Sequence, residues 1–96
     1  MHLEIITPET KIFSGEIEAV QLPGVDGLFQ ILNGHAPIIS SLTEGNVKVD
    51  LLKFFEETED TNPLIEKDAK NGKVISVKIN GGVLEMQNDK VILLAE

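Results

Sequence analysis

The sequence predicts an all-β fold, either a sandwich or a barrel, and three observations support this prediction. Several short runs alternate apolar and polar residues with a period of two, as half-buried strands do. Turn-forming pairs such as Asp26-Gly27, Asn33-Gly34 and Asn71-Gly72 separate these runs at intervals of roughly 8–12 residues. No helical periodicity of 3.6 residues persists long enough to indicate a substantial helix.

The first half of the chain contains three predicted extended segments. In residues 2–7, Leu3 and Ile5 alternate with His2 and Glu4, and the segment ends at Pro8. In residues 16–22 the apolar positions change phase halfway along, which predicts a β-bulge inside one strand. Residues 35–42 are also predicted to be extended, because Pro37 disfavours the helical conformation for the residue before it.

The second half supplies four more strands. Residues 46–52 and 74–80 alternate cleanly, and residues 84–87 continue the pattern after Gly81-Gly82. Two consecutive glycines at that point predict a close approach of another backbone. Residues 91–95 are apolar throughout and predict a strand buried on both faces.

Residues 54–72 interrupt the strand pattern. The segment holds six acidic residues, two lysines and one proline, and it is predicted to be a solvated, mobile hairpin loop. Asp60 and Asn62 begin a spacing typical of calcium loops, but Ile65 stands where that motif requires glycine. The sequence therefore does not support a calcium site here.

Length, charge and cysteine content narrow the class of protein. Ninety-six residues make one domain, and no apolar run approaches the length of a membrane span. The formal net charge is −8, with eight lysines and no arginine, which disfavours nucleic acid and anionic lipid as partners. The absence of cysteine excludes disulfides and thiolate sites, and favours a cytoplasmic protein whose partners are proteins.

The residues that could perform catalysis form no recognisable site. Asp26, His35 and Ser40 or Ser41 could be named as a triad, but a chain of this size offers such a set by chance. No phosphate-binding loop is present. The strand carboxylates are expected mainly on the polar faces as solubility charges: Glu4, Glu16, Glu18, Asp50 and Glu85. The sequence predicts no enzyme, no cofactor and no metal.

Three blocks of sequence resemble the ATP synthase epsilon subunit of bacteria. The first is Leu3–Gly15, which includes Phe13-Ser14-Gly15. The second runs from Leu22 to Gly45 and contains Pro23-Gly24-Val25-Asp26-Gly27 and Gly34-His35-Ala36-Pro37. The third is Asn80–Val91, which is similar to the family's Gly-Gly-x-Leu-Glu-Val-Gln motif, with Met86 for the usual Val. The blocks occur in the family's order and together cover nearly all of the chain outside residues 54–72.

The resemblance implies a flattened antiparallel β-sandwich of about ten short strands over residues 1–96. It also implies a mechanical role in the central stalk, linking the gamma shaft to the membrane c-ring so that proton-driven rotation is coupled to ATP synthesis. By position, Thr7, His35 and Ser40 match the gamma-facing surface, and Val25, Asp26, Gly27 and Leu28 match the tip that faces the c-ring. The implied location is peripheral, on the cytoplasmic face of the bacterial inner membrane, without insertion into lipid.

Some positions depart from the family pattern. Leu28 stands where many members have an acid, which puts an ion-pair contact with the c-ring in doubt, and the acidic segment 54–72 is longer than usual. The family's inhibitory two-helix hairpin is expected after Leu94-Ala95-Glu96, and these 96 residues lack it. His35 has a structural alternative, which is to fix its own loop through a backbone hydrogen bond. The alternative to the stalk function is a stand-alone β-sandwich that binds a protein or a ligand.

Overall fold

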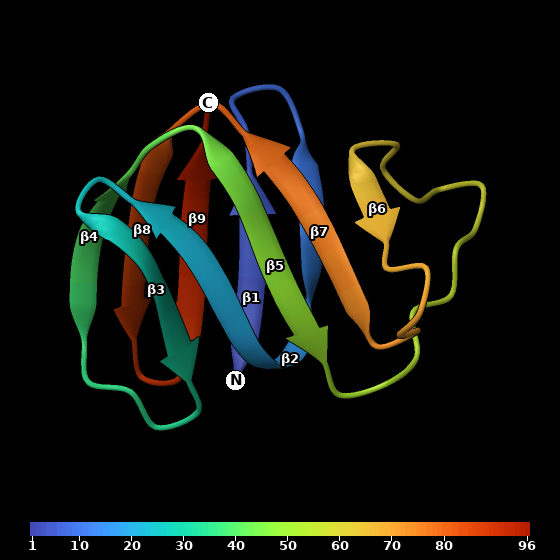
Figure 1. Cartoon of the computed structure of the whole chain (residues 1–96), viewed down its shortest axis with the longest axis horizontal. Coiled ribbons are helices and arrows are strands. Elements are labelled where there is room, and N and C mark those ends of the chain that lie inside the picture. Colours follow the sequence, from blue (N-terminus) through green and yellow to red (C-terminus); the bar gives the residue numbers. More distant parts are fainter.

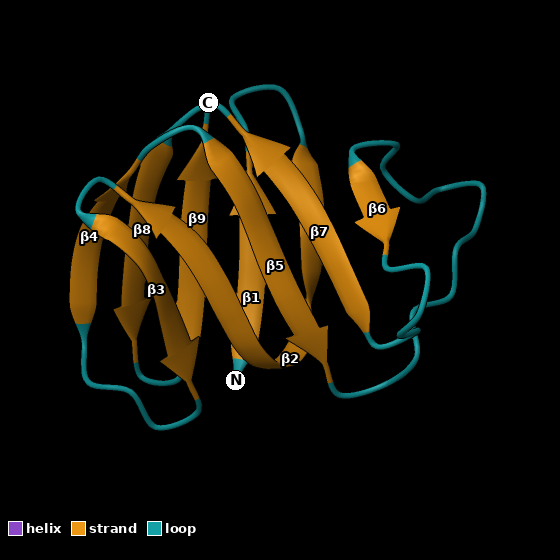
Figure 2. Cartoon of the chain, in the orientation of Figure 1, coloured by secondary structure: helices purple, strands orange, loops and turns teal.

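The computed structural model describes all 96 residues and contains nine strands in two packed layers (Figure 1). In chain order they are β1 (His2–Ile6), β2 (Lys11–Gly24), β3 (Gly27–Leu32), β4 (Ile38–Leu42), β5 (Gly45–Leu51), β6 (Ile65–Lys67), β7 (Val74–Ile79), β8 (Gly82–Gln87) and β9 (Lys90–Ala95). Every one of these elements is a strand, as the secondary-structure colouring also shows (Figure 2). The prediction of an all-β sandwich is therefore confirmed.

The long strand β2 belongs to both layers. Its first half pairs with β1 and completes a sheet ordered β4-β8-β9-β1-β2, while its second half lies between β3 and β5 in a sheet ordered β3-β2-β5-β7-β6. The two sheets are the back and front layers of Figure 1. The resemblance predicted about ten strands and the structure has nine. Since β2 is shared, each layer still has five.

A β-bulge lies where β2 passes from one layer to the other. Ile17 pairs with Leu51 but Ala19 pairs with Asp50, so Glu18 is the extra residue on the bulged strand. The bulge changes the phase of the strand, so that Ile17 and Val20, which are three residues apart, are both buried. The predicted bulge is confirmed, and the strand is longer than the 16–22 segment that the sequence indicated.

One pair of neighbouring strands is parallel, which corrects the expectation of a wholly antiparallel sandwich. β1 and β9 run in the same direction, from His2 opposite Lys90 to Ile6 opposite Leu94. The first and last strands are far apart in the chain, so no tight turn forces them to be antiparallel. Alternation within a strand does not reveal which strand becomes its neighbour.

The core is a single cluster of 21 buried residues between the layers. Leu3, Ile5 and Leu93 are fully buried, as the alternation predicts, and no polar or charged residue is buried. The prediction that residues 91–95 are buried on both faces is wrong, because Leu94 is 54% exposed on the outer side of the sheet. A continuous apolar run does not distinguish a strand covered on both sides from one with an apolar outer surface.

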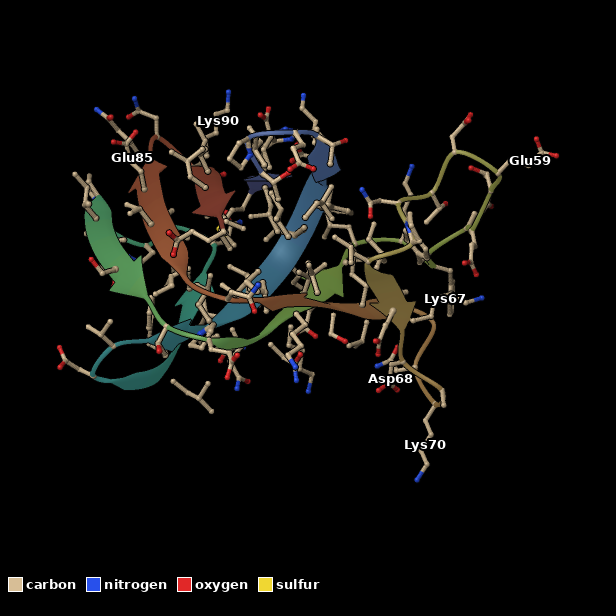
Figure 3. All side chains as sticks on the ribbon, turned by 90° about the horizontal axis from the view of Figure 1, so that it is seen from above. Glu59, Lys67, Asp68, Lys70, Glu85 and Lys90 are labelled. Carbon is tan, nitrogen blue, oxygen red and sulfur yellow. The ribbon has the colours of Figure 1, made fainter.

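The acidic segment 54–72 is more ordered than a simple loop. It contains β6, which pairs with the edge of β7, and Ile65 at the start of β6 is only 9% exposed and joins the core. Side-chain turns at Asn62 and Asp68 bracket the strand, the first through a 2.9 Å bond from the Leu64 amide to Asn62 Oδ1. The segment lies at the end of the long axis opposite to β3 and β4, with Glu59 at its extremity (Figures 1 and 3).

The close backbone approach predicted at Gly81-Gly82 is confirmed. A Cβ atom on Gly82 would overlap the Leu94 carbonyl oxygen and lie 3.2 Å from Ala95 Cα. Gly82 also has φ = +152°, a conformation that residues with a side chain rarely adopt. Glycine at this position therefore allows the first residue of β8 to pair with Ala95, the last residue of β9.

Candidate interaction surface

The turn between β2 and β3 carries the four residues predicted for the c-ring contact. It joins Gly24 and Gly27, which face each other across the hairpin, and Gly27 has φ = +124°. Val25 is 62% exposed and Leu28 is 68% exposed. Together with Asp26 these residues present two apolar side chains and one carboxylate at the end of a rigid hairpin.

Ser40 lies beside this turn and not beside His35. A small hollow of about 240 Å³ is lined by residues 24–29 and by Ser40, which is in the middle of β4. Ser40 pairs with Leu84 on β8, and its hydroxyl lies 3.4 Å from the Ser41 carbonyl oxygen. The structure thus brings a residue predicted for the gamma interface next to the residues predicted for the c-ring interface.

His35 is exposed in the loop between β3 and β4 and fixes that loop. Its Nδ1 lies 2.6 Å from the Ala36 carbonyl oxygen, and its backbone amide donates to the Leu32 carbonyl at 3.1 Å. The first contact requires the proton on Nδ1, because a carbonyl oxygen only accepts. The structural role suggested by the sequence is confirmed.

Thr7 lies at the opposite end of the sheet from His35. It opens the turn between β1 and β2, where its amide donates to the Thr10 carbonyl at 2.8 Å and its Oγ1 accepts from the Thr10 amide at 3.1 Å. The register β4–β8–β9–β1 aligns Ser41, Val83, Leu94 and Ile6 across the sheet. Thr7 follows Ile6 at one end of this row, and Ser41 stands at the other end. Ser40, which pairs with the buried Leu84, points to the opposite side of the sheet.

The structure reveals an apolar outer face that the sequence analysis did not single out. We use this name for the outward side chains Ile39, Val83, Ile92, Leu94 and Ile6 on β4, β8, β9 and β1. Ile39 is 73% exposed, Leu94 54% and Val83 45%. Directly paired residues point to the same side of a sheet, and the registers Val83↔Leu94 and Leu94↔Ile6 therefore make a contiguous apolar row. The unbroken apolar run at 91–95 was the one signal of this surface in the sequence.

Charged groups gather beside the apolar row on the same sheet. Glu4 is the centre of this cluster, with Lys90 Nζ at 3.9 Å, Lys11 Nζ at 4.0 Å and His2 Nε2 at 3.4 Å. His2 Nδ1 lies 2.7 Å from Glu16 Oε2, next to the amino terminus. The face is therefore divided into an apolar part toward Thr7 and an ion-paired part toward the start of β1.

The outer face of the other sheet is different in character. Its central row runs across β3, β2, β5, β7 and β6 through five polar side chains: Gln30, Gln21, Lys48, Ser76 and Glu66. Exposed apolar residues there, such as Leu32, lie at the margin on β3. The two faces of the sandwich thus differ, and only the sheet β4-β8-β9-β1 presents an apolar row across several strands.

The remaining surface offers little for a small ligand or a reaction. A hollow of about 590 Å³ next to His35 is lined by seven residues, of which one is hydrophobic. No group of three or more His, Cys, Asp or Glu side chains is placed to hold a metal ion. No helix with the length and apolarity to cross a bilayer occurs in the structure. These features fit a concave apolar ligand site poorly.

The fold and this surface define a two-layer β-sandwich whose conspicuous feature is a flat, partly apolar face suited to protein contact. Residues 1–54 match the family model described as the ATP synthase delta/epsilon chain, β-sandwich domain. The chain is 39% identical over 94 residues to the ATP synthase epsilon chain of Chlorobium limicola, which covers 98% of this chain and 86% of the relative. It is 32% identical over 96 residues to that of Caulobacter vibrioides, which covers all of this chain and 90% of the relative.

A solved structure shows the same fold. A chain of the Euglena gracilis mitochondrial ATP synthase, in a structure of its OSCP, F1 and c-ring, superimposes with a TM-score of 0.71 and 18% identity. The match covers 97% of this chain and 48% of the Euglena chain, so the chain spans about half the length of that protein. The chain belongs to the ATP synthase epsilon chain family.

Proposed function

We propose that this chain is a non-catalytic subunit of the central stalk of a rotary ATP synthase, linking the gamma shaft to the membrane c-ring. The observation that carries the proposal is the 39% identity to an epsilon chain over 98% of these residues. A structure with no buried charged group and no apolar ligand cavity fits a connector better than a catalyst. Its role is to transmit rotation, and it requires no cofactor.

The gamma subunit is the proposed partner of the apolar outer face. This face is a contiguous apolar patch formed by the exposed side chains of Ile39, Val83 and Leu94. Contiguous apolar patches mark protein contacts, whereas single exposed apolar residues do not. Thr7 lies near one end of the apolar row, and His35 lies beyond the start of β4. Of the three residues predicted for gamma, Thr7 and His35 lie at the margins of this face, whereas Ser40 pairs with the buried Leu84 and points to the inner side of the sheet.

The turn Val25–Leu28 is the proposed contact with the c-ring. It projects from the end of the sandwich farthest from the acidic segment (Figure 1), and Val25 and Leu28 are well exposed. With leucine at position 28, contact with the polar c-ring loops would depend on Asp26 and on the apolar side chains. The complex would lie on the cytoplasmic face of the bacterial inner membrane, with this chain held there by protein contacts and not by lipid.

Two exposed leucines provide a matched test of the gamma interface. Leu94 on the apolar outer face is 54% exposed, and Leu32 on the opposite sheet is 55% exposed. Calorimetric titration of purified gamma subunit should show that Leu94→Glu weakens binding at least ~30-fold, because an interface leucine at a central position is replaced by an unpaired charge. Leu32→Glu should change the dissociation constant by less than about three-fold.

The same titration extends to His35 and Ser40, replaced singly by bulky charged residues. We expect each to weaken binding less than Leu94→Glu does, since His35 lies at the rim of the face and Ser40 points to the inner side of its sheet. If the wild-type chain does not bind gamma at near-physiological salt, the stalk assignment is wrong, and a stand-alone β-sandwich module becomes the reading to pursue. If both leucine variants bind equally well, the assignment of the face is wrong.

A further inference from the structure

Glu85 occupies an unusual position in the middle of the apolar outer face. It lies on β8, directly between Ile39 of β4 and Ile92 of β9, with Val83 two residues away on the same side of the strand. Its carboxylate points outward from the upper layer (Figure 3). A charged group is thus flanked by apolar side chains on at least three sides.

The carboxylate of Glu85 has no partner within the chain. It takes part in none of the structure's ion pairs or side-chain hydrogen bonds, whereas Glu4 on the same face has Lys11, Lys90 and His2 within 4.0 Å. The cations of this sheet are therefore gathered around Glu4. Glu85 carries an uncompensated negative charge in a protein whose formal net charge is already −8.

The surface on the β4 side of Glu85 can receive a long side chain. One shallow hollow of about 400 Å³ is lined by Pro37, Ile38 and Ile39 on one side and by Glu85 on the other. A second hollow of about 310 Å³ on the other side of Glu85 is mostly polar, lined by Gln87, Asn88, Lys90 and Ile92. The apolar wall of Pro37, Ile38 and Ile39 leading to the Glu85 carboxylate suits an arginine or lysine, whose aliphatic stem packs on apolar groups while its charged end forms an ion pair.

We propose that Glu85 receives an arginine or lysine of the partner subunit that docks on the apolar outer face. The inference rests on the proposed function, in which another stalk subunit covers this face. Covering Glu85 without supplying a cation would bury an unpaired charge, which is strongly unfavourable. A partner with a cation at this point would replace water with a charge-assisted hydrogen bond, and the negative charge of this chain would favour its approach.

Removal of the charge alone tests the proposal. Glu85→Gln keeps the size of the side chain but cannot form an ion pair, and the matched control Glu66→Gln removes one exposed charge on the opposite sheet. Titration of the gamma subunit should show a 10- to 100-fold loss of affinity for Glu85→Gln, on the order expected for truncating one member of a covered charge pair, and less than about two-fold for Glu66→Gln. Raising the salt concentration should weaken wild-type binding more than Glu85→Gln binding.

The outcomes separate this inference from the proposed function. If the wild type binds and Glu85→Gln binds within two-fold of it, no partner cation engages Glu85 and the inference fails, while the stalk function stands. If the wild type does not bind at all, the proposed function fails, and the inference fails too because it depends on that function. If Glu85→Ile binds as tightly as the wild type but self-associates, the carboxylate serves only to keep copies of the chain apart, and this also overturns the inference.

Discussion

Replacement of Gly82 by alanine tests the close contact between β8 and β9. Gly82 combines φ = +152° with a backbone approach that leaves no room for a Cβ atom, since the Leu94 carbonyl oxygen and Ala95 Cα occupy its position. Neither neighbour is the end of a flexible side chain. The substitution must therefore either displace β9 or strain both strands, and β9 carries the fully buried Val91 and Leu93.

The adjacent Gly81 provides the control. It has a similar φ of +143°, but the nearest atom to its Cβ would be Glu96 Oε1 at 2.7 Å, at the end of a movable side chain, and the nearest backbone atom lies at 3.5 Å. Gly81→Ala should cost only the conformational strain, about 1–2 kcal/mol. Gly82→Ala adds overlap with fixed backbone and should cost roughly 3–5 kcal/mol.

These costs are large relative to the whole stability of a domain of this size. The free energy of unfolding for 96 residues is on the order of 5–14 kcal/mol, and each kcal/mol lowers the melting temperature by about 4–8 °C. Because the chain has no Trp and no Tyr, urea unfolding is best followed by far-ultraviolet circular dichroism. If Gly82→Ala is within about 1 kcal/mol of Gly81→Ala, the close backbone approach does not limit the sequence at this position and the reasoning is refuted.

Two further predictions concern the acidic segment and the charged cluster. Ile65→Ala should destabilise the domain by about 2–4 kcal/mol in the same urea assay, because Ile65 anchors β6 in the core; Leu64→Ala, at a 53% exposed neighbour, should cost less than about 0.5 kcal/mol. Equal effects of these two would mean that Ile65 does not anchor the segment. Glu16→Gln should cost no more than about 1 kcal/mol, since Glu16 is 60% exposed and its pairs with His2 and the amino terminus are screened by water. A larger loss would show that this pairing is shielded from solvent.

Much of the fold could be predicted from local patterns. Alternation identified the strands around residues 46–52 and 74–80 because each has one face in the core and one in water. The phase change in β2 predicted a bulge, since one extra residue shifts every following side chain to the other face. β6 could not be predicted, because a three-residue strand amid acidic residues has too short a pattern to be distinguished from a loop.

The candidate site was harder to predict than the fold. The bond from His35 to its own loop was correctly anticipated. The relative positions of Thr7, His35 and Ser40 could not be read from the sequence. Ser40 lies beside the turn Val25–Leu28, and Thr7 lies at the far end of the sheet from His35. The apolar outer face depends on which strands become neighbours, and strand neighbours are set by long-range pairing.

The sequence by itself determined the all-β class, the positions of most strands, the acidic character and the family. These properties follow from alternation, turn residues and motifs that lie within short stretches of chain. Only the tertiary structure decided that β1 and β9 are parallel, that Leu94 is exposed, and that Glu85 lies between Ile39 and Ile92 without a partner. The physical reason is that register and strand order bring together residues that are distant in sequence, and a local pattern contains no information about the residue that will lie opposite.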